Sequence, residues 1–203
     1  GAAVGRLVVS MFSTLDGVMQ GPGVPGEDVE GGFPFGGWQA PFADDGAGAV
    51  ILEQILAQDA LLIGRKTYDI WVNHWPQARD AIGDRFNAIP KFVASRTLTD
   101  PTWAGTTVAS DVPRDVAAIK DAHAETRVWG SSDLLTTLLD ADLVDALDLF
   151  IYPVVLGTGK KWFRDGVLPA RFAPSGPPRG FDGGSVLLSY ARDGVPEFGS
   201  MDG

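Results

Sequence analysis

Short strand-like segments alternate with helix-like segments along most of this chain, and this alternation limits the folds that it can adopt. Apolar spacing distinguishes the two kinds of segment. The expected strands span residues 6–12, 59–64, 91–95, 106–110, 127–130, 145–157 and 185–192. The expected helices span residues 47–58, 78–89, 111–119 and 131–144. Because a parallel crossover usually needs a helix, this order predicts an α/β fold with a mostly parallel sheet and helices on both faces.

Two segments rich in glycine and proline interrupt the alternation. Residues 21–38 (GPGVPGEDVEGGFPFGGW) are predicted to form a long loop over a functional site. Residues 174–184 connect the last two strands without a helix, so these two strands are expected to be antiparallel. The sequence predicts a single domain over residues 1–203, with a core over 5–192 and a tail over 193–203.

The composition excludes several classes of protein. The 203 residues carry a formal net charge of -10, which opposes binding to nucleic acid or to an anionic membrane. The chain has no cysteine, and its two histidines, His74 and His123, lie far apart, so neither a disulfide nor a metal site is expected. No run approaches the ~20 apolar residues of a transmembrane helix. The N-terminal residues do not resemble a signal peptide, so a cytoplasmic location is expected.

Polar residues follow three of the predicted strands at the point where each strand ends. The stretch LLIGRKTY, residues 61–68, places a glycine and two adjacent cations there, and the other two ends read Ser95-Arg96 and Gly130-Ser131-Ser132-Asp133. Ligands of parallel sheets bind at these ends. Glycines, hydroxyls and cations suit a phosphorylated ligand, and the helix after Gly130 would direct free N–H groups at a pyrophosphate. The alternative is that Ser131 or Ser132 only caps that helix.

Two other glycine-rich segments give no support for nucleotide binding. Residues 21–26 match G-x-G-x-x-G but contain two prolines and precede no apolar helix, so they are predicted to be loop. Residues 157–161 (GTGKK) lack the first glycine and the Ser or Thr of a P-loop. No G-x-S-x-G elbow is present to support a hydrolase.

Five segments, in order, resemble the dihydrofolate reductase superfamily, and within it the C-terminal reductase domain of the bifunctional riboflavin-biosynthesis enzyme. They are STLDG (13–17), LLIGRKTYDIW (61–71), KFVASRTL (91–98), VWGSSDLL (128–135) and IYPVVLGTGKKWF (151–163). The resemblance implies an NADPH-dependent reductase on an eight-stranded, mostly parallel sheet with an antiparallel edge. By position, it implies that the cofactor is bound by Gly64, Arg65, Thr67, Ser95, Arg96, Gly130, Ser131, Ser132 and Leu134.

The same resemblance gives fewer residues for the substrate. Asp16 is the candidate catalytic residue, as a polar substrate contact or proton relay, and the alternative is an Asp-Gly turn residue. Ser13 and Trp38 are further substrate candidates, and Trp71 and Trp75 are also considered for stacking on a flat ring. The folate enzymes carry a carboxylate on the first helix. Its place falls near Gly48 in this sequence, which disfavours dihydrofolate as the substrate.

The expected function is therefore that of an NADPH-dependent reductase of a small pyrimidine- or pterin-like heterocycle. It resembles the 5-amino-6-(5-phosphoribosylamino)uracil reductase of riboflavin biosynthesis. Two alternatives stay open, a dihydrofolate or pteridine reductase and a non-catalytic nucleotide-binding module. Residues 145–157 (DALDLFIYPVVLG) are more apolar than an exposed edge strand tolerates, and related reductases pair, so a homodimer is expected. Neither a nucleic acid nor a membrane is an expected partner.

Overall fold

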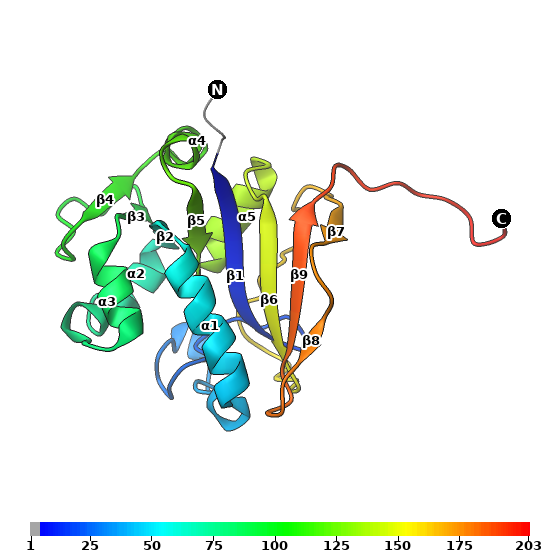
Figure 1. Cartoon of the computed structure of the whole chain (residues 1–203), viewed down its shortest axis with the longest axis horizontal. Helices are drawn as coiled ribbons and strands as arrows, with labels where there is room; N and C mark the ends of the chain where they lie inside the picture. The colour runs from blue at the N-terminus through cyan, green and yellow to red at the C-terminus, as the bar shows by residue number, and fades with distance from the viewer. Residues whose placement is uncertain (1–4) are drawn as a thin grey trace.

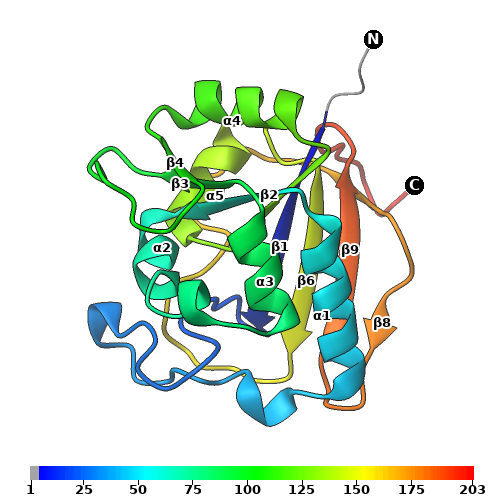
Figure 2. The same cartoon turned by 60° about the vertical axis from the view of Figure 1, so that its left-hand side comes forward.

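The computed structural model describes residues 5–203, which form one nine-stranded sheet with helices on both faces (Figures 1 and 2). The strand order is β4-β3-β2-β5-β1-β6-β9-β7, and β8 also pairs with β9. The strands are β1 (Arg6–Thr14), β2 (Ala60–Gly64), β3 (Lys91–Ala94), β4 (Thr106–Ala109), β5 (Glu125–Val128), β6 (Ala146–Tyr152), β7 (Phe172–Pro174), β8 (Arg179–Gly180) and β9 (Val186–Arg192). Strands β1 to β6 pair in parallel, and β9 is antiparallel to its neighbours β6, β7 and β8.

Five α-helices complete the core. They are α1 (Asp45–Ala57), α2 (Arg65–Trp71), α3 (Ala81–Ala88), α4 (Val112–Ala122) and α5 (Ser132–Asp140). Successive residues of a strand point to opposite faces of the sheet. In β2, Leu62 accordingly packs in the cluster that contains residues of α4 and α5, whereas Leu61 and Ile63 pack with residues of α1, α2 and α3. The predicted α/β fold, with helices on both faces, is confirmed.

The last long strands, β6 and β9, are antiparallel, as the sequence predicts. The sheet has nine strands rather than eight, because β8 and the end of β7 lie within the expected loop 174–184 and pair with β9. The strand expected over 145–157 ends at Tyr152, just before Pro153, which has no N–H to donate to a ladder. The helix expected over 131–144 ends at Asp140, and residues 65–71 form an additional short helix, α2.

The position of β6 contradicts one sequence-based argument. Residues 145–157 are apolar, but β6 lies inside the sheet between β1 and β9 and is not an edge strand. Leu147, Leu149 and Phe150 are buried in the two cores on either side of the sheet. The apolar character of this segment is therefore explained by burial within one chain, and it gives no support for a homodimer.

The connection between β1 and α1 contains the predicted loop, residues 21–38. Within residues 21–38 the only regular element is one 3-10 turn at Glu30–Gly32, and residues 21–26 form turns and bends. Residues 157–161 likewise precede no helix, so neither glycine-rich segment is a nucleotide-binding loop of the usual strand-loop-helix kind. Within residues 5–203, none of the helices has the length and apolar character needed to cross a membrane.

Candidate active site at the carboxyl ends of the strands

A cavity of about 740 Å³ lies where β2, β3 and β4 end, next to the start of α5. Because these strands are parallel, their carboxyl ends share one edge of the sheet. We call it the strand-end cavity. It is lined by Gly64, Arg65, Lys66, Ala94, Ser95, Arg96, Ala109, Ser110, Asp111, Val112, Pro113, Ser131, Asp133, Leu134 and Thr137. Six of the nine residues predicted to bind a cofactor belong to this lining: Gly64, Arg65, Ser95, Arg96, Ser131 and Leu134.

The glycines at two strand ends allow the backbone segments to approach each other closely. The Gly64 amide donates a 2.9 Å hydrogen bond to the Gly130 carbonyl. A β-carbon added to Gly64 would lie 2.2 Å from Ser131 Oγ, and one added to Gly130 would lie 2.6 Å from Thr67 Oγ1. Gly130 also has a φ of 143°, which side-chain-bearing residues rarely adopt. A larger residue at either position would therefore displace the turn that leads into α5.

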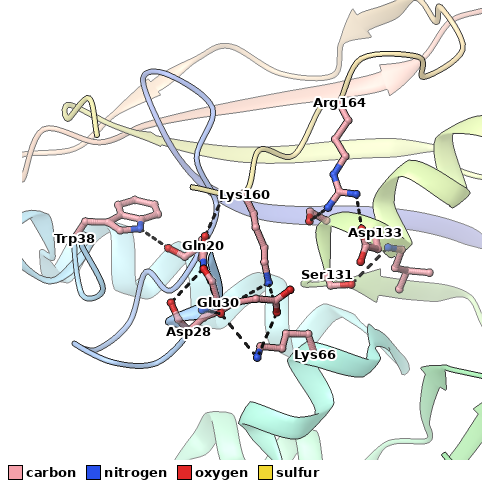
Figure 3. A network of polar contacts seen from close by, with 11 residues as sticks. Gln20, Asp28, Glu30, Trp38, Lys66, Ser131, Asp133, Lys160 and Arg164 are labelled. Atoms are coloured by element: carbon pink, nitrogen blue, oxygen red, sulfur yellow. Dashed lines mark hydrogen bonds and ion pairs between the residues drawn. The ribbon is translucent and has the colours of Figure 1, made fainter. Parts of the chain in front are cut away.

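The N-terminus of α5 opens onto this turn. Ser131 is the N-cap residue, and its hydroxyl accepts a hydrogen bond from the Leu134 amide at 3.5 Å. Arg164, which follows β6 in sequence, donates to the Ser132 hydroxyl at 2.6 Å and forms an ion pair with Asp133 (Figure 3). Ser131 thus caps the helix, as the alternative interpretation predicts. The cap does not exclude an anion, because the first amides of a helix are free to donate to one.

The two predicted arginines differ in their surroundings. Arg65 forms an exposed 2.9 Å ion pair with Asp69 and donates to Thr97 Oγ1 at 3.1 Å. Arg96 is exposed, and within residues 5–203 it has neither an ion pair nor a side-chain hydrogen bond. The Ser95 hydroxyl accepts from the amides of Thr97 and Leu98 and so shapes the turn after β3. Arg96 is therefore the cation of the strand-end cavity that is most readily available to a ligand.

A second cavity, of about 240 Å³, lies beside the first and shares Lys66 and Ser131 with it. We call it the tryptophan cavity, because three of its walls are Trp71, Trp75 and Trp129. The remaining lining residues are Met11, Phe12, Met19, Gln20, Gly21, Pro22, Gly23, Glu27, Asp28, Gln39, Lys66, Thr67, Ile70, Ser131, Ser132 and Lys160. Two predicted cofactor residues, Thr67 and Ser132, belong to this cavity only.

The indole walls are held by contacts with their neighbours. Trp71 stacks on Phe86 at 5.1 Å between ring centroids and meets Trp75 edge to face at 6.1 Å. Trp129 donates its indole N–H to Gln58 Oε1 at 3.3 Å. These contacts limit the rotation of the rings and leave flat apolar surface toward the cavity. Trp71 and Trp75 thus lie where stacking on a ligand is possible, and Trp129 joins them.

An ion-pair network fastens the loop of residues 21–38 over the tryptophan cavity (Figure 3). Lys160 lies 3.1 Å from Asp28 Oδ2 and 3.0 Å from Glu30 Oε2. Lys66, from α2, reaches the same two carboxylates at 3.9 and 3.5 Å. Gln20 donates to the carbonyl oxygen of Glu30 and accepts from the Lys160 amide. Lys66, the second of the adjacent cations, is therefore engaged with the loop.

Burial and ion pairing have opposite effects on the pKa of Asp28, which is 7% exposed. Burial raises the pKa of this carboxyl, but hydrogen bonds from the Glu30 amide and from Lys160, with the nearby charges of Lys160 and Lys66, outweigh it. The net effect is a lowered pKa. Asp28 is therefore ionised at neutral pH and attracts both lysines to the loop.

The three residues predicted to contact the substrate lie outside the lining of both cavities. Ser13 is fully buried and accepts from the Trp162 indole, while Trp38 packs edge to face on Tyr152 and donates to the Gln20 carbonyl. The Asp16 carboxylate accepts from Thr14 Oγ1 at 2.6 Å and from the amides of the segment after β6 (Leu156 and Gly157) at 3.2 and 2.8 Å. Burial acts to raise the pKa of Asp16, but these hydrogen bonds outweigh it and lower the pKa. These are the contacts of a turn residue.

The sequence reasoning missed the polar residues that the loop brings to the tryptophan cavity. Glu27 and Asp28 lie on the segment EDVE, which follows the dismissed G-x-G-x-x-G match, and Lys160 lies in the dismissed GTGKK segment. The sequence signal for them is a pair of adjacent acids, Glu27 and Asp28, in one loop and a pair of adjacent lysines, Lys160 and Lys161, in the other. Gly48, the place of the missing helix carboxylate, lines neither cavity. Residues 5–203 contain no cluster of three or more His, Cys, Asp or Glu suited to a metal ion.

Solved structures share the fold of this chain. A putative riboflavin biosynthesis protein from Shewanella sp. PV-4 superposes with a TM-score of 0.64 at 19% identity, over 93% of this chain and 99% of that chain. A dihydrofolate reductase from Enterococcus faecalis complexed with NADP(H) superposes with a TM-score of 0.59 at 13% identity, over 93% and 96% of the two chains. The fold is that of the dihydrofolate reductase class.

The sequence comparisons give the family. Residues 6–175 match the model of the RibD C-terminal domain. The uncharacterized protein YyaP of Bacillus subtilis (strain 168) is 29% identical over 166 residues, which make up 79% of this chain and 81% of that protein. The family match covers most of the chain, so the chain belongs to the RibD C-terminal domain family. This assignment supports an oxidoreductase of the riboflavin-biosynthesis type.

Proposed function

We propose that the chain is an NADPH-dependent reductase of a small heterocyclic, pyrimidine- or pterin-like substrate. One observation carries the proposal: the strand-end cavity, with its cations and helix N-terminus, opens beside the tryptophan cavity, with its flat apolar walls. A nicotinamide dinucleotide has phosphates at one end and a flat ring at the other, so two adjoining cavities of these kinds suit it. The NADP(H) bound by the Enterococcus faecalis structure supports the same choice.

The residues present fit this cofactor. Gly64 and Gly130 keep the turn before α5 free of side chains that would fill it, and the α5 N-terminus suits a pyrophosphate. Arg65, Ser95 and Arg96 would hold the 2′-phosphate, since they bring cations and a hydroxyl to the lining of the strand-end cavity. When bound, NADPH supplies the hydride. The protein's own task is then to orient two flat rings and to exclude water, for which the indole walls and the fastened loop are suited.

The carboxylate position of the folate enzymes separates the two enzyme alternatives. Gly48 lies at that position on α1 and offers no acid, which favours the pyrimidine-type reductase over a dihydrofolate or pteridine reductase. The non-catalytic nucleotide-binding module makes a different prediction, because such a module binds NADPH but does not oxidise it, whatever substrate is offered. These alternatives are distinguishable by experiment.

The test has two stages. NADPH and NADH are first titrated into the protein, with nicotinamide fluorescence as the readout, and we expect tighter binding of NADPH. Oxidation of bound NADPH is then followed with a panel of pyrimidine- and pterin-type heterocycles, with and without a ribose phosphate. Equal affinities for the two nucleotides would overturn the cofactor assignment. Tight binding of NADPH without oxidation by any heterocycle would favour the non-catalytic module.

A further inference from the structure

One charged side chain in the lining of the tryptophan cavity has no ion-pair partner within residues 5–203. Four ionisable side chains belong to its lining, Glu27, Asp28, Lys66 and Lys160. Asp28 accepts from Gln20, from the Glu30 amide and from Lys160. Both lysines are engaged with Asp28 and Glu30. Three of the four charges are therefore satisfied within the protein, and only Glu27 lacks a counter-ion among residues 5–203.

Glu27 has one carboxylate oxygen to offer. Its Oε2 accepts a 3.1 Å hydrogen bond from the Gly23 amide, and its Oε1 has no hydrogen-bond partner in the described part of the chain. Burial and the nearby charge of Asp28 raise the pKa of Glu27, although the Gly23 amide acts to lower it. An acidic group in this state gains from a ligand that brings an N–H donor or a positive charge.

A second acceptor lies in the same cavity. Gln39 donates its side-chain amide to Tyr152 Oη at 2.9 Å, which leaves its carbonyl oxygen, Oε1, without a partner in residues 5–203. Glu27 and Gln39 are both half-buried, and a ligand with more than one donor is complementary to these two acceptors of one cavity lining. A planar group with neighbouring N–H donors, held between indole walls, meets both requirements.

The same charges disfavour a phosphate in this cavity. A phosphate needs an available cation, but Lys66 and Lys160 are already paired with carboxylates of the loop. An added anion would also face the unpaired charge of Glu27.

We infer that Glu27, with the Gln39 carbonyl oxygen of the same cavity lining, recognises the substrate, and that the substrate is a flat nitrogen heterocycle that carries amino or protonated ring nitrogen groups and no phosphate. Glu27 thus places a carboxylate in the tryptophan cavity from the loop of residues 21–38, whereas position 48 on α1 lines neither cavity. The inference rests on the proposed function, because that function brings the reacting heterocycle to the tryptophan cavity. It differs from the phosphorylated uracil substrate of the reductase that the sequence resembles.

The test uses three flat probes of one size and different charge, without nucleotide. Benzamidine is a cation with two NH₂ groups, benzamide is its neutral analogue, and benzoate is an anion. Each is titrated against the full chain with tryptophan fluorescence as the readout. We expect benzamidine to bind on the order of tenfold or more tighter than benzamide, and benzoate to bind most weakly. Glu27→Gln should abolish the preference for benzamidine, whereas Glu53→Gln, which removes an exposed charge on α1, should preserve it.

The pH dependence gives a measurement on the unmodified protein. Asp28, Lys66 and Lys160 line the cavity with Glu27, and the carboxyl of Asp28 has the lower pKa. Benzamidine affinity should therefore weaken first as falling pH protonates Glu27, at a pH above the usual range for glutamate. Ribose 5-phosphate at millimolar concentration should not displace the probe. Benzoate binding as tight as benzamidine, or displacement by ribose 5-phosphate, would overturn the inference while leaving NADPH binding, and hence the proposed function, intact.

Discussion

Arg96 and Arg65 lie on neighbouring strand ends, but only Arg65 forms an ion pair. We expect Arg96→Ala to weaken NADPH binding by about tenfold to a hundredfold and NADH binding little, because charge-assisted hydrogen bonds contribute about 1.5–3 kcal/mol. Arg65→Ala should act in the same direction with a smaller effect, since Asp69 already neutralises this arginine. Titration with both nucleotides measures the difference, and Arg179→Ala on β8 is the matched control. Raised salt should weaken NADPH more than NADH. Equal losses of both nucleotides would contradict this role.

Asp16 stays a candidate for the substrate side of the reaction, and its contacts suggest how it would act. Its carboxylate binds the amides of Leu156 and Gly157, a few residues before Lys160, which fastens the loop over the tryptophan cavity. We expect Asp16→Asn to lower turnover through this loop and to leave NADPH affinity nearly unchanged. Steady-state kinetics and nucleotide titration are compared on the same preparation. A matching loss of NADPH affinity would indicate a turn residue that supports the whole edge of the sheet.

Lys91 is fully buried and donates to the carbonyl oxygens of Phe86 and Ile89 at 2.9 Å, near the end of α3. Burial lowers its pKa from 10.5 to about 8. Because the folded chain releases this proton at a lower pH than the unfolded chain, rising pH favours folding between about 8 and 10.5. Lys91→Met should destabilise the chain by about 1–3 kcal/mol at neutral pH, because two buried carbonyls lose their donor. Urea unfolding should show that the loss of unfolding free energy in this variant grows with pH over that interval. A loss that stays constant with pH would contradict the lowered pKa.

At the scale of elements, the loop of residues 21–38 depends on a few ion pairs. We expect Lys160→Met to accelerate amide hydrogen exchange across this loop by about tenfold or more, because Asp28 and Glu30 lose their shorter ion pairs. Lys161→Met is the matched control, since the exposed Lys161 has no ion pair within residues 5–203. Exchange rates that are the same in both variants would mean that Lys66 and the loop's own hydrogen bonds are sufficient.

The same loop should respond to acid. Asp28 and Glu30 both have lowered pKa values, so their contribution is present at neutral pH and is lost as the pH falls through those values. Protection of the loop in wild type should therefore be complete above about pH 4.5, the ordinary value for glutamate, and decrease as the pH falls below the ordinary values of Glu30 and then of Asp28. This acid dependence should be smaller in Lys160→Met, in which only Lys66 still pairs with the two carboxylates.

Elements were predictable where local pattern decides the structure. The β-branched runs gave the strands, and Asp44, Asp80 and Asp111 cap helices that the sequence indicates. The pattern failed for α2, whose seven residues include two cations and few apolar positions, and for β8, whose two residues owe their pairing to β9. It also misplaced β6, because an apolar strand inside a sheet and an apolar edge strand that pairs with a second chain have the same sequence signature.

At the scale of the whole molecule, the homodimer stays a prediction. The sequence argument for it does not hold, because β6 lies inside the sheet. An apolar groove beside β6 and β9 is nevertheless open to water, and Phe163 is 41% and Leu168 55% exposed there. Exposed apolar surface of this kind favours pairing between copies. We expect light scattering to give twice the chain mass of 21.5 kDa, and Leu168→Asp to shift the protein toward the monomer. A monomer across micromolar concentrations would contradict the prediction.

The strand-end cavity could be predicted from the sequence, but the tryptophan cavity could not. Residues at parallel strand ends must gather on one edge, so the strand-end cavity follows from topology, and its glycines and arginines follow from short motifs. The tryptophan cavity is formed by residues that are far apart in the sequence, such as Gln20 with Lys160 and Trp71 with Met11. No local sequence pattern indicates that such residues meet in the fold. Glu27 in particular lies in a loop that is fastened by Lys160, more than a hundred positions later in the sequence.

Lys66 lines both cavities and is paired with the carboxylates of the loop, so the two cavities are not thermodynamically independent. A polyanion bound in the strand-end cavity would compete with Asp28 and Glu30 for Lys66 and would loosen the closure over the tryptophan cavity. Linkage is reciprocal, so a ligand that tightens the loop would weaken the binding of the polyanion by the same free energy. If the proposed nucleotide is that polyanion, its binding and the closure of the loop would oppose each other without a separate regulatory site.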